Sequence, residues 1–213
     1  MEAKRTLVFD FDGTIADTLP RILAISNRLS SEFGYRKLPD EAIELFRGKR
    51  SREALEQLQI PMIKLPVIAR RMKAELQKEI HLLKPIASVK EVICELAPHY
   101  RLGIVTSNSL PNVEQFLEAN EMAFFDFIHS SSSLFGKSSV LRGVLRSRRL
   151  LQEETIYIGD ETRDIEAAKK SGIDMIAVSW GANSAEVLAS LQPQFLIHQP
   201  KGLLALLTEG MKE

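Results

Sequence analysis

The sequence has little cysteine, no excess of charge of either sign and no long apolar run. One cysteine, Cys94, occurs in 213 residues, which excludes an internal disulfide and a zinc site built from cysteines. Lys plus Arg and Asp plus Glu number 28 each, so no overall field attracts nucleic acid or an anionic membrane. No apolar run approaches the roughly 20 residues that span a bilayer. We therefore expect neither nucleic acid nor membrane as a partner.

The start of the chain and its composition indicate an ordinary folded protein. The first residues, MEAKRTLVFDF, contain charges but no apolar stretch followed by small residues, so we expect a cytoplasmic location. The hydrophobic content of 45% and the length suit one sizeable domain, or a core domain with a smaller insertion. Cys94 falls within an apolar helical pattern, which predicts a small core residue.

Short apolar runs rich in β-branched and aromatic residues alternate with helical patterns. The predicted strands are residues 6–11, 102–107, 127–131, 155–160, 175–180 and 195–198. The predicted helices between them are residues 87–98, 110–120, 138–150 and 164–171. This alternation predicts an α/β fold, a doubly wound parallel sheet covered by helices on both faces in three layers.

One stretch breaks the alternation. Residues 17–84 contain helical patterns at 20–33, 40–46, 51–58 and 66–83, with no convincing strand. Proline and glycine punctuate this stretch, and Pro85 marks the expected return to the sheet. We therefore predict an α/β core domain of residues 1–16 and 85–213, with a small all-helical cap of residues 17–84 inserted after the first strand.

Polar residues stand where four of the predicted strands end, which is where an open parallel sheet binds its ligands. The first strand runs into Asp10, Asp12, Gly13 and Thr14, where Gly13 permits a sharp exit from the strand and Thr14 adds a hydroxyl at the rim of the site. Two carboxylates spaced two residues apart in extended chain project to the same side and face one ligand. A carboxylate can attack a phosphoryl group and a second one can move protons. The alternative for this segment alone is a solvated turn with two helix-capping acids.

The other strand ends supply groups that suit phosphate and a cation. The second strand ends in Thr106, Ser107 and Asn108, whose hydroxyl and amide groups can hold phosphate oxygens, and Lys137 follows the third. Asp160 and Asp164 are four residues apart and share one face of a helix start. Together with Asp10 they form an acidic cluster that suits Mg²⁺, although acids also stabilise helix N-termini without a metal.

These segments, in this order, resemble the four signature motifs of the haloacid dehalogenase-like hydrolases, and the segments 176–181 and 192–195 are similar to phosphoglycolate phosphatase-like members. The resemblance implies Asp10 as the phosphate-accepting nucleophile and Asp12 as the general acid/base. It also implies Asp10, Asp160 and the backbone carbonyl of Asp12 as Mg²⁺ ligands, with Asp164 behind them. The chain departs from the family pattern after Lys137, where serine stands in place of the usual proline.

In this family the cap reads the substrate, and residues 46–53 form the cap segment expected to reach the site. Lys49, Arg50 or Arg52 would bind a substrate carboxylate or a second phosphate, with a solvated basic turn as the alternative. We expect a Mg²⁺-dependent phosphatase that hydrolyses a small phosphorylated metabolite, phosphoglycolate-like or a sugar phosphate, through an aspartyl-phosphate. The alternatives are a phosphosugar mutase, which passes the phosphoryl group to another hydroxyl, and a non-catalytic binding protein with the same fold.

Overall fold

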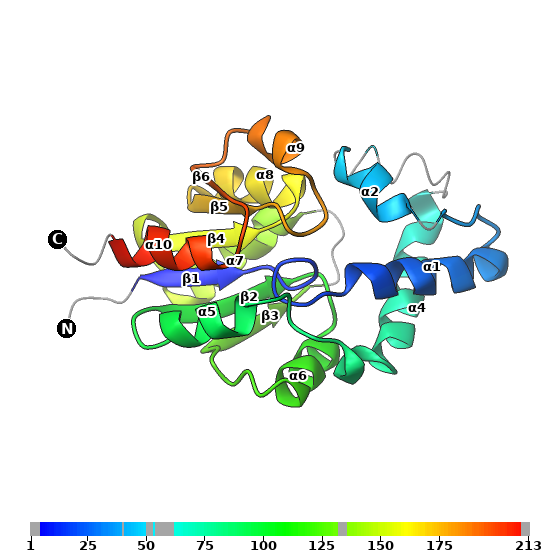
Figure 1. The fold of residues 1–213 in the computed structure, drawn as a ribbon, viewed down its shortest axis with the longest axis horizontal. Coiled ribbons are helices and arrows are strands. Elements are labelled where there is room, and N and C mark those ends of the chain that lie inside the picture. Colours follow the sequence, from blue (N-terminus) through cyan, green and yellow to red (C-terminus); the bar gives the residue numbers. More distant parts are fainter. Residues whose placement is uncertain (1–4, 40, 50–52, 54–61, 132–135, 210–213) are drawn as a thin grey trace.

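The computed structural model describes residues 5–39, 41–49, 53, 62–131 and 136–209. Within these residues, six strands form one sheet in the order β3-β2-β1-β4-β5-β6, and every neighbouring pair is parallel (Figure 1). The strands are β1 (Thr6–Phe9), β2 (Arg101–Thr106), β3 (Phe127–Ser130), β4 (Thr155–Gly159), β5 (Asp174–Val178) and β6 (Phe195–Ile197). The strand order reverses direction between β1 and β4, and ligands bind at this point in doubly wound sheets.

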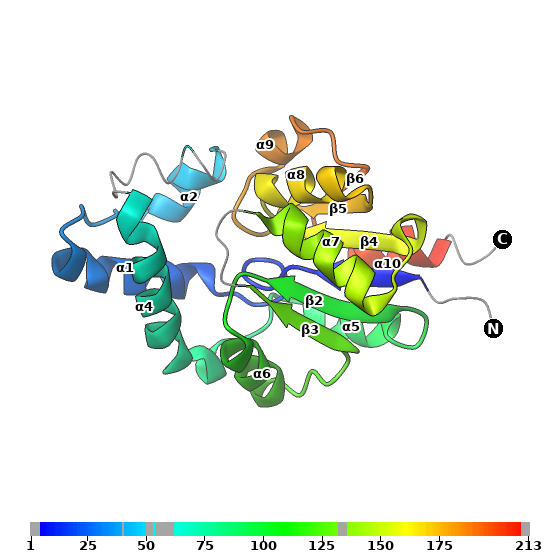
Figure 2. The same ribbon diagram turned by 180° about the vertical axis from the view of Figure 1, so that it is seen from behind.

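Helices cover both faces of the sheet, as the sequence predicts (Figures 1 and 2). Alternate residues of β1 serve the two faces: Leu7 and Phe9 belong to one buried cluster and Val8 to the other. The first cluster is covered by α5 (Val89–Leu96), α6 (Leu110–Ala119) and α10 (Lys201–Glu209). The second is covered by α7 (Lys137–Arg148), α8 (Thr162–Ser171) and α9 (Ala185–Ala189), and the short η3 (Gln152–Glu154) precedes β4.

The segment between β1 and β2 is helical in its described parts. It contains α1 (Leu19–Phe33), α2 (Ala42–Arg47), η1 (Met62–Lys64), α4 (Leu65–Gln77) and η2 (Ile80–Leu82). Helices α1 and α4 pack side by side beyond one end of the sheet (Figures 1 and 2). The predicted helices 20–33 and 40–46 correspond to α1 and α2, whereas the predicted helix 51–58 lies outside the described residues apart from Glu53. The division into core and cap domains stays a prediction.

The predicted helix 66–83 is wrong in its last third, because α4 ends at Gln77 and only a 3₁₀ turn follows. The backbone carbonyls that come next bond to the rest of the chain. The Leu83 carbonyl accepts the Asn120 side-chain amide at 3.0 Å, and the Lys84 carbonyl accepts the N–H of Asp17 at 3.1 Å. These long-range bonds draw the chain back to the sheet in an extended form that periodicity within the segment does not indicate.

The prediction for Cys94 is also wrong, and two helices were missed. Cys94 is exposed on α5, because Val89, Val92, Ile93 and Leu96 form the buried face of that helix. Helices α9 and α10 were not predicted.

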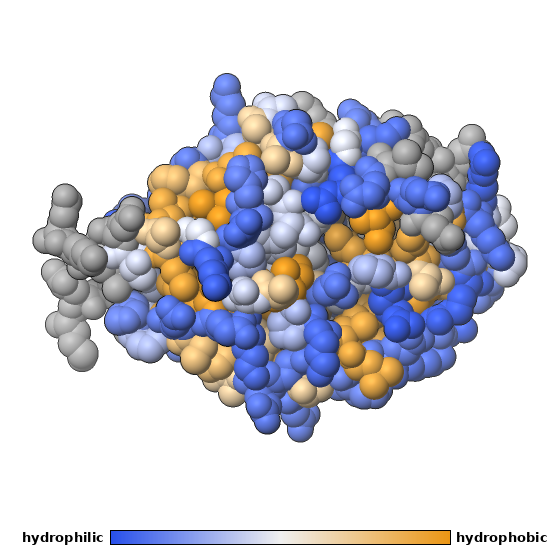
Figure 3. Space-filling model, viewed as in Figure 1, coloured by the Kyte–Doolittle hydropathy of each residue, from blue (hydrophilic) through white to orange (hydrophobic). Residues whose placement is uncertain are grey.

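Figure 3 shows apolar residues in several small areas among hydrophilic ones on the face seen in Figure 1. Among the described residues, no helix has the length and apolar character needed to cross a membrane.

Candidate active site

The turn after β1 places the first predicted motif. Strand β1 ends at Phe9, and the Phe11 carbonyl then accepts the N–H groups of Ile15 and Ala16, which closes a tight loop. The Phe11 ring is fully buried and meets Phe116 edge to face, at a centroid distance of 5.1 Å. The aromatic anchor fixes the chain between the two acids, so that Asp10 is held beside the sheet.

Gly13 is required in this loop for two reasons. Its φ of +77° lies in the left-handed region, which side chains disfavour. A Cβ built at this position would also lie 2.4 Å from Oδ2 of Asp160. The sequence predicts the sharp turn correctly. Thr14, expected at the rim, is instead buried and donates its hydroxyl to Asp160 at 2.6 Å. The loop after β1 therefore packs directly on the acidic residue that follows β4.

Three carboxylates from two strand ends gather at the strand-order reversal. Asp10, Asp160 and Asp164 are all buried, and each offers one carboxylate oxygen within 4.8 Å of the others. Backbone groups hold the two later acids. The Ala182 N–H donates to Asp160 at 2.7 Å, and the Glu161 N–H donates to Asp164 at 3.0 Å as part of a capping box that starts α8.

Lys137, the first residue of α7, lies among these carboxylates. Its Nζ donates to Oδ2 of Asp10 at 2.7 Å and also to Oδ1 of Asp164. Burial favours the neutral amine, but Asp10 and Asp164 outweigh it and hold the pKa of Lys137 well above its ordinary value. The lysine stays charged, although serine rather than proline follows it.

The donor set fits a hard divalent cation. Lys137 pairs with two of the three carboxylates, those of Asp10 and Asp164, so the cluster has more acidic groups than the lysine can balance in a buried place. Burial and neighbouring acids, Glu161 first among them, raise the pKa of Asp160 well above its ordinary value. Burial also raises the pKa of Asp164 to about 6, against the opposing effect of Lys137. Hard cations take oxygen ligands of this kind, and a cation here would relieve the repulsion.

The Asp12 side chain is not one of the three clustered carboxylates and has a different partner. The side-chain amide of Asn108 donates to its two carboxylate oxygens, at 2.9 and 3.2 Å. Burial, together with the nearby charge of Asp10, raises the pKa of Asp12 to about 6, while the amide of Asn108 works in the other direction. An acid with a pKa near neutral can both donate and accept a proton under ordinary conditions.

The second motif converges on the same place. Thr106 is buried, and its Oγ1 accepts the backbone N–H of Asn108 at 2.9 Å. Thr106, Ser107 and Lys137 line one small cavity with Arg163. The structure therefore brings together residues predicted for phosphate contact from the end of β2 and the start of α7. Asn108, also predicted to contact phosphate, has its side-chain amide on Asp12.

Three residues near the site were given no role by the sequence analysis, although Arg163 stands within the polar segment after the fourth strand. Arg163 lines the small cavity and pairs with Glu161, and its charge lowers the pKa of Asp12. Lys73 of α4 is half-buried close enough to Asp12 to sense its charge, and burial lowers its pKa. Asn183 follows β5 and accepts the Thr162 N–H at 2.9 Å. Arg163 and Asn183 stand beyond strand ends, so the rule used for the other motifs would have found them, whereas nothing local distinguishes Lys73.

The predicted cap segment contacts the loop after β5. The Arg47 guanidinium donates to the Ser179 carbonyl at 2.8 Å, and the Lys49 carbonyl accepts the Asn183 side-chain amide at 2.7 Å. Trp180 of the same loop donates its indole N–H to the Thr14 carbonyl at 3.2 Å. These bonds set the segment near the carboxyl ends of the strands. Arg50 and Arg52 lie outside the described residues, so their predicted role stays a prediction.

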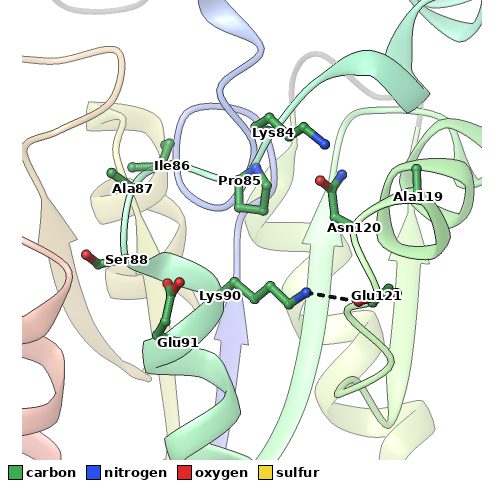
Figure 4. Close-up of a pocket in the computed structure, with 10 residues that line it drawn as sticks. All are labelled: Lys84, Pro85, Ile86, Ala87, Ser88, Lys90, Glu91, Ala119, Asn120 and Glu121. Atoms are coloured by element: carbon green, nitrogen blue, oxygen red, sulfur yellow. Dashed lines mark ion pairs between the residues drawn. The ribbon is translucent and has the colours of Figure 1, made fainter.

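A pocket of about 370 Å³ lies where the chain returns from the inserted helices to the sheet (Figure 4). It is lined by Lys84, Pro85, Ile86, Ala87, Ser88, Lys90, Glu91, Ala119, Asn120 and Glu121. The residues predicted for phosphate or metal are absent from this lining. The candidate active site is therefore recognised by its converging polar groups and not by the volume of a cavity.

Comparisons with known proteins agree with this geometry. A family model described as haloacid dehalogenase-like hydrolase matches residues 7–178. A phosphoglycolate phosphatase of Synechococcus elongatus is 28% identical over 98% of this chain and 100% of its own. A pyrophosphatase of Listeria welshimeri is 28% identical over 96% of each chain.

A solved structure from Streptococcus pneumoniae has the same fold. It is a hydrolase of the haloacid dehalogenase-like family that is 24% identical, and it superposes with a TM-score of 0.81 over 97% of this chain and 100% of its own. The family match covers the strand ends that carry Asp10, Thr106 and Asp160. The chain belongs to the haloacid dehalogenase-like hydrolases.

Proposed function

We propose that this protein is a Mg²⁺-dependent phosphatase that hydrolyses a small phosphorylated metabolite through an aspartyl-phosphate on Asp10. One observation carries the proposal: two neighbouring acids have different surroundings. Asp10 lies in the carboxylate cluster on Lys137, whereas Asp12 is held by a neutral amide and has a pKa near 6. Two carboxylates in different surroundings are suited to different roles, here one as the nucleophile and the other as the general acid and base.

In the first step, a carboxylate oxygen of Asp10 attacks phosphorus and the bond from phosphorus to the leaving oxygen breaks. Asp12 donates its proton to that oxygen, so the alcohol departs neutral. In the second step, Asp12 takes a proton from water as the water oxygen attacks phosphorus. The acyl-phosphate bond breaks, which releases inorganic phosphate and restores the Asp10 carboxylate. Proton transfer of this kind accelerates a reaction by roughly 10²- to 10⁴-fold.

Other side chains would hold the substrate and the cation. Lys137, the Thr106 hydroxyl and the Ser107 backbone would contact the oxygens of the transferring group, which is supported by their shared lining of one small cavity. Asp10, Asp160 and Asp164 would hold Mg²⁺, with the Asp12 backbone carbonyl as a further ligand, and the bound cation would offset charge on the phosphoryl oxygens. The segment around Arg47 and Lys49, which contacts the loop after β5, would meet the remainder of the substrate.

The names of the relatives guide the choice of substrates for a test. Phosphate release should be measured from 2-phosphoglycolate, pyrophosphate, a hexose phosphate and 4-nitrophenyl phosphate, each with Mg²⁺ and with a chelator in its place. We expect release with Mg²⁺ only, fastest from a small phosphate ester that carries a second anionic or polar group. No release from any of the four with Mg²⁺ would indicate a binding protein, and equal release with the chelator would refute the metal requirement.

A further inference from the structure

A chain of amide hydrogen bonds joins Asp12 to the inserted helices. Asn108 donates to the Asp12 carboxylate, and Nδ2 of Asn112 in α6 donates to Oδ1 of Asn108 at 2.9 Å. The same Nδ2 donates to the backbone carbonyl of Lys73 in α4 at 3.1 Å. The carboxylate proposed to move protons is therefore linked to helix α4 through two side chains, neither of which is itself ionisable.

The orientation of the Asn108 amide depends on this chain. Its Oδ1 accepts two N–H groups, from the backbone of Ser109 at 2.8 Å and from Asn112. With Oδ1 held on that side, Nδ2 must face Asp12. The backbone of Asn108 is fixed as well, since its N–H donates to Thr106 and its carbonyl accepts the Ser130 hydroxyl at 2.5 Å. Rotation of the amide is the motion that remains, and Asn112 opposes it.

The orientation of Asn112 follows from its surroundings. The side chain is fully buried, at 0% exposure, and its Oδ1 has no hydrogen-bond partner among the described residues. Reversing the amide would set Oδ1 against two acceptor oxygens, so the donor side must face Asn108 and Lys73. A buried polar atom without a partner is unfavourable, which makes this asparagine a poor choice for packing alone.

We propose that Asn112 is a positioning residue, which holds the Asn108 amide toward Asp12 and joins that carboxylate to helix α4. The Asp12 carboxylate is then oriented toward the leaving oxygen only while α4 packs against α6. The inference rests on the proposed function, because it assigns Asn112 an effect on proton donation and none on the attack by Asp10.

Leaving groups that need a proton to different degrees make this role measurable. Phenyl phosphate and 4-nitrophenyl phosphate have similar sizes, but the nitro group makes the departing oxygen a weaker base that needs less protonation. The values of kcat/KM for both esters, measured with Mg²⁺, report the step in which the leaving group departs. Asn112→Leu, which keeps the size of the side chain and removes its donors, should lower kcat/KM for phenyl phosphate about tenfold more than for 4-nitrophenyl phosphate.

Asn120 provides a matched control. It is a buried asparagine of the same helical region, and its amide also donates to two carbonyls, of Leu83 and Phe116, without touching Asn108. Asn120→Leu should change kcat/KM for the two esters by one common factor. A double-mutant cycle adds a second test: in an Asn108→Ala background, Asn112→Leu should cause no further selective loss, because its effect passes through Asn108.

Circular dichroism and thermal unfolding should accompany each variant, and Asn112→Ala replaces Asn112→Leu if the larger apolar side chain prevents folding. An equal loss for both esters in the Asn112 variant, or a further selective loss in the Asn108→Ala background, would overturn the positioning role while the proposed function stands. If the unaltered protein releases phosphate neither from these two esters nor from 2-phosphoglycolate, pyrophosphate or a hexose phosphate, the proposed function is refuted and this inference with it.

Discussion

Lys137→Met tests how the carboxylate cluster is balanced in the metal-free protein. The lysine side chain is 14% exposed and pairs with Asp10 and Asp164, whose side chains are 4% and 0% exposed. Removing one partner of a buried ion pair typically costs about 3 to 5 kcal/mol, because it leaves uncompensated charge. We expect a loss of about 3 kcal/mol in the free energy of unfolding at pH 8, measured by urea unfolding with a chelator present.

The pH dependence of this loss follows from the raised pKa of Asp164, about 6 even beside the lysine. A carboxyl whose pKa is higher in the folded state contributes stability that is present below its unfolded pKa and lost as the pH rises through its folded pKa. Without Lys137 the pKa of Asp164 rises further, so the folded variant binds more protons at pH 5. Its loss of unfolding free energy relative to the unaltered protein should therefore be smaller at pH 5 than at pH 8. A loss of equal size at pH 5 and pH 8, or none at either, would refute this reasoning.

A surface ion pair provides the comparison for Lys137→Met. Lys78 is 63% exposed and pairs with Glu75 at 2.8 Å. Exposed pairs contribute about 0 to 1 kcal/mol, so Lys78→Met should change the free energy of unfolding within about that range at both pH values.

Three further predictions concern the metal, the turn and the cap. Asp160→Asn should weaken Mg²⁺ binding and activity together, because the amide can still contact Thr14 and Ala182 but lacks the negative charge. Calorimetric Mg²⁺ titration and phosphate release measure the two effects, and unchanged affinity and turnover would contradict the assignment. Gly13→Ala should cost about 1 to 3 kcal/mol of stability and reduce activity, whereas Gly34→Ala, at a φ of +73° with open space around it, should cost about 1 to 2 kcal/mol and leave activity unchanged. Single replacements should alter the ranking of acidic phosphorylated substrates, by kcat/KM, for at least one of Arg47, Lys49, Arg50 and Arg52; if none of the four does so, this segment does not read the substrate.

The sheet and its strand ends could be predicted because their signals are local. Short apolar runs such as residues 6–11 and 155–160 are strands in the structure, although each ends one or two residues early. The strand stops at Phe9 because the carbonyl of Phe11 turns to bond within the next loop. Parallel pairing then brings Asp10 and Asp160 to one edge, which follows from the fold class alone.

The parts that could not be predicted depend on contacts between distant segments. The Asn112 side chain looks like an ordinary polar residue near the start of a helix, and only the packing of α4 on α6 gives it the Lys73 carbonyl as an acceptor. Thr14 was expected at the rim, but it is buried, because its hydroxyl bonds to Asp160 after β4 and its backbone carbonyl accepts the Trp180 indole N–H. Neither arrangement leaves a spacing or a composition that a sequence pattern could reveal.

The central claim is that Asp10 bonds to phosphorus while Asp12 moves protons. It is tested most directly by intact-protein mass spectrometry after acid quenching of a reaction with 4-nitrophenyl phosphate, whose leaving group needs little protonation. Asp12→Asn should show a phosphate adduct that maps to Asp10, because the second step slows more than the first, and Asp10→Asn should show none. An adduct on Asp12, or full activity in Asp10→Asn, would contradict the account.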